Sequence, residues 1–133
     1  MASNISDANA VISGLLESAF PSTPIAFPDT PFIAPSSAQW LRLSIVWGDG
    51  DLATMGATNR NTIVGVVQVE VYTPPSQGDG ANTRLADQVR DVYNRLESSG
   101  VRFNVPSAPI HDNTETAWCR RLIRVPFTFD ETV

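Results

Sequence analysis

The chain has 133 residues with a hydrophobic fraction of 42%, which suits one folded domain with an ordinary core. Its formal net charge of −5 disfavours sequence-independent binding to nucleic acid or to an anionic membrane. One cysteine excludes an internal disulfide, and no Cys/His cluster has the spacing of a zinc site. We expect no signal peptide and no membrane helix, so the expected compartment is the cytoplasm or a particle assembled there.

Residues 4–19 are predicted to form an amphipathic helix, because their apolar residues recur every three or four positions. Asn4 or Ser6 can cap its start, and Pro21 ends it. Residues 21–37 contain five prolines, which lack the N–H that a central strand must donate. We therefore expect an extended arm here, with at most a short strand.

Two strands are predicted next. Residues 39–47 alternate between apolar and mixed positions, and so do residues 62–73. Between them, 48–61 is rich in Gly, Asp, Asn and Thr and is predicted to be an exposed loop. It is long for a hairpin connection, and long loops in compact domains are often functional.

The second half of the chain is predicted to contain one helix and two strands. Gly78, Asp79 and Gly80 favour a turn, after which Asn82 would cap a helix over 83–98 that ends at Gly100. A short strand and then a long strand follow this helix.

The two strands cover 101–105 and 117–129. Pro126 lies inside the second strand, so we expect that strand at a sheet edge or bulged. The order helix, strand, strand, helix, strand, strand favours a single α+β domain over residues 1–133. Its largely antiparallel sheet would have four to five strands, with the two main helices on one face.

No residue pattern indicates catalysis, a cofactor or a metal. His111 is the only histidine and lies in a polar stretch, while Cys119 alternates with apolar residues and suits a core position. Asp49-Gly-Asp51 is without the further ligands of an EF-hand loop, so a solvated turn is favoured over a cation site. The three tryptophans lie in an acidic chain, which favours core or interface positions over base stacking.

An ordered set of short motifs resembles phage tail terminator-like proteins. The set comprises P-I-A-F at 24–27, W-L-R-L at 40–43, G-V-V-Q-V-E-V-Y-T-P at 65–74, L-A-D at 85–87 and V-P-F at 125–127. The resemblance spans about residues 8–129 and implies a curved, mixed sheet flanked by helices. It implies a non-enzymatic structural protein of the virion, assembled in the host cytoplasm without a cofactor.

The resemblance also implies a mechanism and partners. Such proteins form a hexameric ring of identical subunits on the completed tail tube, stop its polymerisation and present a surface to the head-completion proteins. The partners would be other copies of the chain, the major tail tube protein and a head-completion or connector protein. DNA would pass through the lumen without specific binding. The alternative interpretation is a head-closure or neck adaptor protein of the phage connector.

Four residues are candidates for the contacts to a neighbouring subunit or to the tail tube. They are Asp49, Asp51, Met55 and Arg60. All four lie in the 48–61 segment, where the alternation of the flanking strands is lost. A solvated role for these side chains is the competing interpretation.

Overall fold

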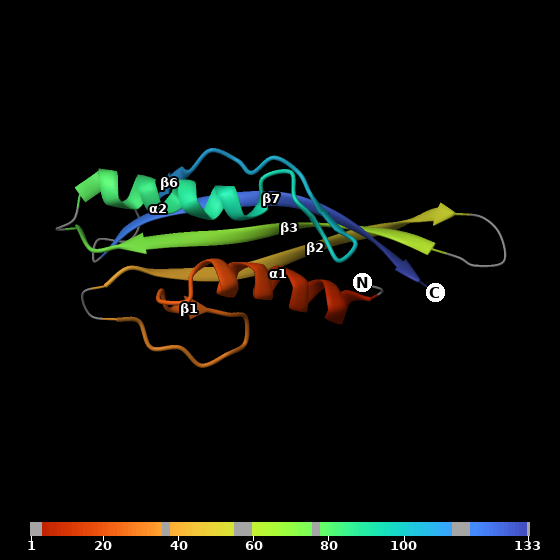
Figure 1. Cartoon of the computed structure of the whole chain (residues 1–133), viewed down its shortest axis with the longest axis horizontal. Helices are drawn as coiled ribbons and strands as arrows, with labels where there is room; N and C mark the ends of the chain where they lie inside the picture. The colour runs from red at the N-terminus through yellow and green to blue at the C-terminus, as the bar shows by residue number, and fades with distance from the viewer. Residues whose placement is uncertain (1–3, 36–37, 55–59, 76–77, 113–117, 133) are drawn as a thin grey trace.

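The computed structural model describes residues 4–35, 38–54, 60–75, 78–112 and 118–132, with 49–54, 60, 111–112 and 132 described by their backbone alone. Two helices lie on one face of a long, twisted sheet (Figure 1). The elements in chain order are α1 (Ile5–Ala19), β1 (Ile25–Ala26), β2 (Trp40–Thr54), β3 (Arg60–Thr73), α2 (Gly78–Tyr93), β4 (Glu97–Ser98), β5 (Val101–Phe103), β6 (Ile110–Asp112) and β7 (Cys119–Thr132).

The predicted α+β domain with a largely antiparallel sheet is confirmed. The strands follow the order β1-β2-β3-β7-β5-β4, and β6 also pairs with β7. Only the β1–β2 pair is parallel among the described strands. The sheet has seven strands rather than four to five, because β1, β4 and β6 are two or three residues long and too short to show an alternating pattern.

Helix α1 follows its prediction closely. The Asn4 side chain accepts a hydrogen bond from the backbone N–H of Asp7 at 2.8 Å, as an N-cap should. Ala8, Ile12 and Leu16 are fully buried, so the predicted apolar stripe faces the sheet. The helix therefore forms where its sequence indicates.

The predicted exposed loop at 48–61 is wrong at both ends. β2 runs on to Thr54 and β3 begins at Arg60, and Asp51 pairs with Thr62. The pairing has two register shifts, between Trp47 and Gly50 and after Leu52. Glycine and aspartate have low strand propensity, but pairing with a neighbouring strand overrides local preference. The segment is thus mainly a long hairpin, and 55–59 lie outside the described residues.

Strand β7 lies inside the sheet, contrary to the prediction of an edge or a bulge. It pairs with β3 without a register shift from Cys119 to Thr132, and Pro126 pairs with Val66. The Pro126 carbonyl accepts from the N–H of Asn104 at 2.9 Å, so this residue's backbone faces away from β3. Because the missing N–H points away from β3, the β3–β7 ladder stays intact.

Helix α2 begins and ends five residues earlier than predicted. Gly78, Asp79 and Gly80 form its first turn, and Asn82 is buried within it instead of capping it. The helix stops at Tyr93, and Arg95 then adopts a positive φ of 53°. Residues 97–103 fold as a β4–β5 hairpin.

The β4–β5 turn explains the role of Gly100, which was predicted to cap a helix. Ser98 pairs with Val101, so Ser99 and Gly100 are the two turn residues, with φ values of 50° and 86°. Two successive positive φ values are typical of a type I′ turn, whose twist suits a tight hairpin. Gly100 therefore closes a strand pair and not a helix.

The main core lies between the helices and one face of the sheet. As the alternation predicted, this face carries Leu41 and Leu43 of β2, Val67, Val69 and Val71 of β3, and Ile123, Val125, Phe127 and Phe129 of β7. The Tyr93 hydroxyl donates a hydrogen bond to the Ile12 carbonyl at 2.9 Å, which joins α2 to α1 within this core. Neither of the two described helices lies on the opposite face of the sheet.

Candidate functional site

Three of the four predicted contact residues belong to the far part of the β2–β3 hairpin. Asp49 and Asp51 lie on β2, Arg60 opens β3, and Met55 is outside the described residues. The hairpin extends beyond both helices, on the right of Figure 1. The side chains of the other three residues are also outside the description, so their contacts stay a prediction.

The open face of the sheet begins with an aromatic cluster beneath the arm. The rings of Trp40 and Tyr72 are stacked, with centroids 3.9 Å apart and an interplanar angle of 3°. Phe32 packs on Trp40 from the arm at 5.2 Å, and Trp118 meets Trp40 edge-on at 6.0 Å. The guanidinium of Arg42 lies 5.4 Å from the Trp40 ring. This second small core holds the arm against the sheet.

Charged groups surround the Tyr72 hydroxyl. It donates a hydrogen bond to Glu70 Oε2 at 2.5 Å, and the same carboxylate oxygen lies 3.3 Å from Arg120 Nε. Burial, followed by the hydrogen bond and the negative charge of Glu70, raises the pKa of Tyr72 to about 12. The phenol is therefore neutral at physiological pH and acts as a donor. The group fixes the positions of these side chains on the sheet.

Further along the same face, the sheet has an apolar hollow of about 360 Å³. Val46, Val66 and Pro126 lie in one cross-strand row within it, and Val64 lies beside them. Val46 is 52% exposed, although isolated valines of strands are usually well covered. An apolar surface of this kind, on a face without helices, favours contact with another protein over contact with water.

A buried polar network fixes the start of α2 on the sheet. The Asn82 amide donates to the carbonyls of Val71 and Cys119 at 3.2 and 2.8 Å, and to the Thr73 hydroxyl at 3.0 Å. Its oxygen accepts from Arg121 Nη1 at 2.8 Å. The nitrogen and the oxygen of the Asn82 amide are therefore both hydrogen-bonded.

Sequence reasoning missed this network. Arg121 is buried on the core face of β7, and it also forms an ion pair with Asp79. The available signal was an arginine within an otherwise apolar alternating set, which needs a buried partner. Asn82 was the polar residue that could supply one, but the Gly-rich context favoured a cap.

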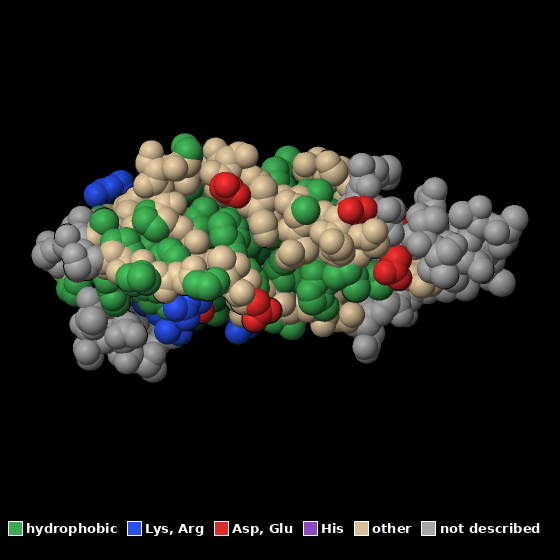
Figure 2. Space-filling view, turned by 90° about the horizontal axis from the view of Figure 1, so that it is seen from below, with side chains coloured by type: hydrophobic (Ala, Val, Ile, Leu, Met, Phe, Trp, Pro, Cys, Tyr) green, Lys and Arg blue, Asp and Glu red, His purple; other side chains and the backbone are tan. Residues whose placement is uncertain are grey.

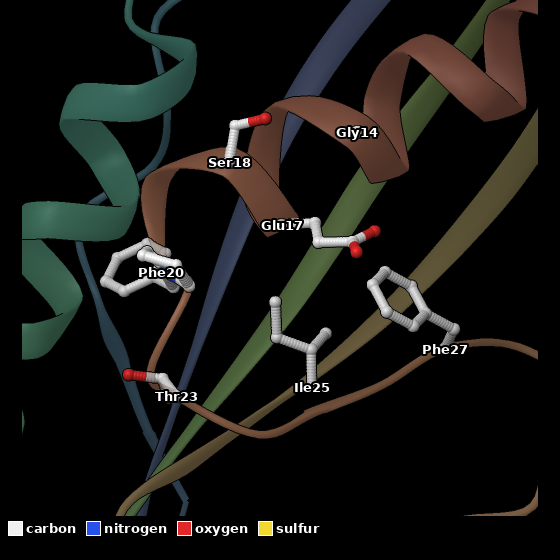
Figure 3. A pocket seen from close by; sticks show the side chains of 8 residues that line it. Gly14, Glu17, Ser18, Phe20, Thr23, Ile25 and Phe27 are labelled. Carbon is white, nitrogen blue, oxygen red and sulfur yellow. The ribbon is translucent and has the colours of Figure 1, made fainter.

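An open pocket of about 530 Å³ separates the C-terminal half of α1 from the arm. Ile25 and Phe27 point from the arm towards α1, and the Glu17 side chain extends over the opening (Figure 3). Gly14 lies on its helical wall. A lone exposed carboxylate beside two apolar side chains provides no set of catalytic groups.

Cys119 and His111 lie on two neighbouring strands, β7 and β6. Cys119 is half-buried, with its Sγ 3.8 Å from Arg121 Nη1. His111 lies on β6 opposite Arg121, and its side chain is outside the description. Among the described residues, no group of three or more His, Cys, Asp or Glu side chains could hold a metal ion. Neither described helix is long and apolar enough to cross a membrane.

Comparisons with known proteins point to one family. A family model described as phage tail terminator protein matches residues 6–127. A solved structure whose title states no function covers 98% of this chain and 97% of its own, at 19% identity and a TM-score of 0.53. That identity supports likeness of fold alone. No curated protein matches the chain.

Proposed function

This chain belongs to the phage tail terminator protein family and so has a structural role in the phage tail, and from that premise we propose that it forms a hexameric ring. The ring caps the tail tube, ends tube polymerisation and presents a surface to a head-completion or connector protein. The observation that carries the proposal is the family match over 6–127, nearly the whole described fold. The ring assembles in the host cytoplasm and stays in the virion at the head–tail junction.

The shape and charge of the subunit support this function. A ring of identical subunits needs two different contact patches on each copy. The uncovered sheet face, the hollow at Val46 and Val66, and the projecting hairpin offer protein-contact surfaces away from the main core. The net charge of −5 suits a lumen through which DNA passes without being held.

The hairpin is the proposed contact to the tube or to the neighbouring subunit. Asp49, Asp51, Met55 and Arg60 remain the candidate residues. Asp49, Asp51 and Arg60 lie in the far part of a paired hairpin, and this position replaces the loop argument because paired strands hold that part away from the body of the subunit. An arginine among acidic residues can form a directional contact to a carboxylate on the partner.

Particles made without this protein test the proposal. A terminator predicts tails longer than normal that carry no heads, as seen by electron microscopy. Filled heads that lose DNA beside tails of normal length would instead assign a head-closure or neck adaptor role. Size-exclusion chromatography with light scattering, over a range of protein concentrations, measures whether the ring exists away from the tube.

A further inference from the structure

The outer edge of β2 is covered at its beginning and then left open. β1 pairs only with Leu41 and Arg42, and the Leu41 N–H donates to the Pro24 carbonyl at 3.0 Å. Backbone groups alternate in direction along a strand, so those of Leu43, Ile45 and Trp47 point to this same edge.

The arm does not continue as a partner for this edge. Pro28 and Pro31 have no N–H to donate, so the chain turns away after two paired residues. Natural edge strands are often protected by lysine, proline or a bulge. β2 has none of these between Leu43 and Trp47, since its first register shift comes after Trp47.

A groove runs along the open edge. Two pockets of about 370 and 530 Å³ lie beside β2, and both are lined by Pro28, Asp29 and Ser44. The larger pocket reaches Ile45 and Trp47 and is bounded by the first turns of α1. Figure 2, which views the molecule from the side of the arm and α1, shows few and scattered charged side chains there.

The opposite side of the sheet has a second open edge. Asn104 and Ser107 donate backbone N–H groups to the carbonyls of Pro126 and Arg124, and β5 covers β7 as far as Thr128. From residue 129 to 132, β7 has β3 on one side and no described strand on the other. Within the described part of the chain, the hairpin end of the sheet therefore consists of β2, β3 and β7, with an open edge on each side.

We infer that these two edges pair between copies, so that the end of β7 in one subunit adds to the groove beside Leu43–Trp47 of β2 in the next. This inference rests on the proposed ring and names its subunit contact. Unpaired backbone donors and acceptors recognise an extended strand, because each such group gains a hydrogen bond. The two edges differ and lie on opposite sides, as a head-to-tail contact requires.

Side chains at the two edges are compatible with this pairing. Leu43, Ile45 and Trp47 of β2 and Phe129 of β7 lie on the same, core face of the sheet, so pairing would continue one apolar row across the contact. Asp130 already accepts from Thr62 Oγ1 at 3.0 Å and lies 3.4 Å from Arg102 Nη2. Its charge is thus partly compensated before a neighbour arrives.

Cysteine cross-linking tests the pairing. In a Cys119→Ser background, Ser44→Cys marks the β2 edge, and Thr128→Cys lies at the last residue that β5 covers, next to the open β7 edge; both side chains are on the open face. Treatment of the free protein and of purified tails with a short bis-maleimide should give a ladder of species up to the hexamer on a denaturing gel. The matched control combines Ser44→Cys with Asp87→Cys, which is exposed on α2, and should give no ladder.

The outcomes separate this inference from the proposed function. Rings seen by light scattering or on tails without a ladder would overturn the edge pairing and leave the ring in place. Equal ladders from the control would also overturn it, as would dimers from Ser44→Cys alone, which would mean that like edges meet. If neither free protein nor tails contain rings, the proposed function fails first and the subunit contact fails with it.

Discussion

Gly65 and Gly14 should respond in opposite directions to the same substitution. Gly65 lies in the middle of β3, between Trp47 and Phe127 in the register. A Cβ at this position would lie 2.6 Å from Phe127 Cζ and 2.9 Å from the Val46 backbone oxygen. The same atom on Gly14 of α1 would have nothing within 4 Å.

The structure sets the magnitude for Gly65→Ala. The Phe127 ring is 1% exposed and meets Trp47 edge-on at 5.5 Å, so it has little room to move. The Val46 oxygen belongs to the backbone of a paired strand and cannot move by itself. Overpacking of this kind costs about 1–3 kcal/mol, which lowers the melting temperature by about 4 °C per kcal/mol. Gly14→Ala should instead stabilise the protein by up to ~1 kcal/mol, the helix propensity difference.

Urea denaturation followed by tryptophan fluorescence measures both changes. Each variant should be tested at two protein concentrations, because subunit association would add to the apparent stability. A double-mutant cycle with Phe127→Leu, which removes the far end of the ring, should recover part of the loss. A change below about 0.5 kcal/mol for Gly65→Ala, or strict additivity in the cycle, would refute the packing argument.

Three other substitutions test the network, the tyrosine and the hairpin. Asn82→Ala should lower the free energy of unfolding by about 2–3 kcal/mol in denaturant, because it leaves buried partners unpaired, whereas Asp87→Ala should change it by less than about 0.5 kcal/mol. The raised pKa of Tyr72, about 12, means that unfolded chains lose the phenol proton first above pH 10, so stability falls as pH rises. Tyr72→Phe should lose less stability between pH 9 and 11, and an equal loss in urea titrations would contradict this. Arg60→Glu should weaken ring or tube binding without altering the melting curve, and normal tails that join heads would argue against Arg60 as a contact.

The sequence predicted the parts of the fold in which one local pattern decides. The stripe of α1 with its Asn4 cap and the alternation of β2, β3 and β7 all describe one buried face, and that face is the core. Local sequence patterns failed where the structure depends on a partner that is distant in the sequence. Pairing with β3 extends β2 past its glycines. Pro126 is tolerated in a central strand because its backbone faces Asn104 and not β3.

The candidate site was less accessible to sequence reasoning than the fold. Asp49 and Arg60 were chosen for a loop that is mainly hairpin, although their place at its far part keeps them in the proposal. The open edge of β2 could not be predicted, because it depends on where the arm leaves the sheet after Ala26. The sequence pattern of one strand does not indicate how far the strand beside it extends.

The central position of β7 has a consequence for synthesis. β3 is synthesised before β7, so it has no second partner strand until β7 has left the ribosome. β5 also has no long strand to pair with until then. α1 likewise meets Tyr93 across 81 positions of sequence. Most contacts between residues are long-range in sequence, and the nascent chain cannot complete its sheet before β7 has been made. A ribosome-bound intermediate in which β3 pairs with β2 but not yet with β7 would expose one edge of β3, so the greatest risk of misassembly comes before the ring forms.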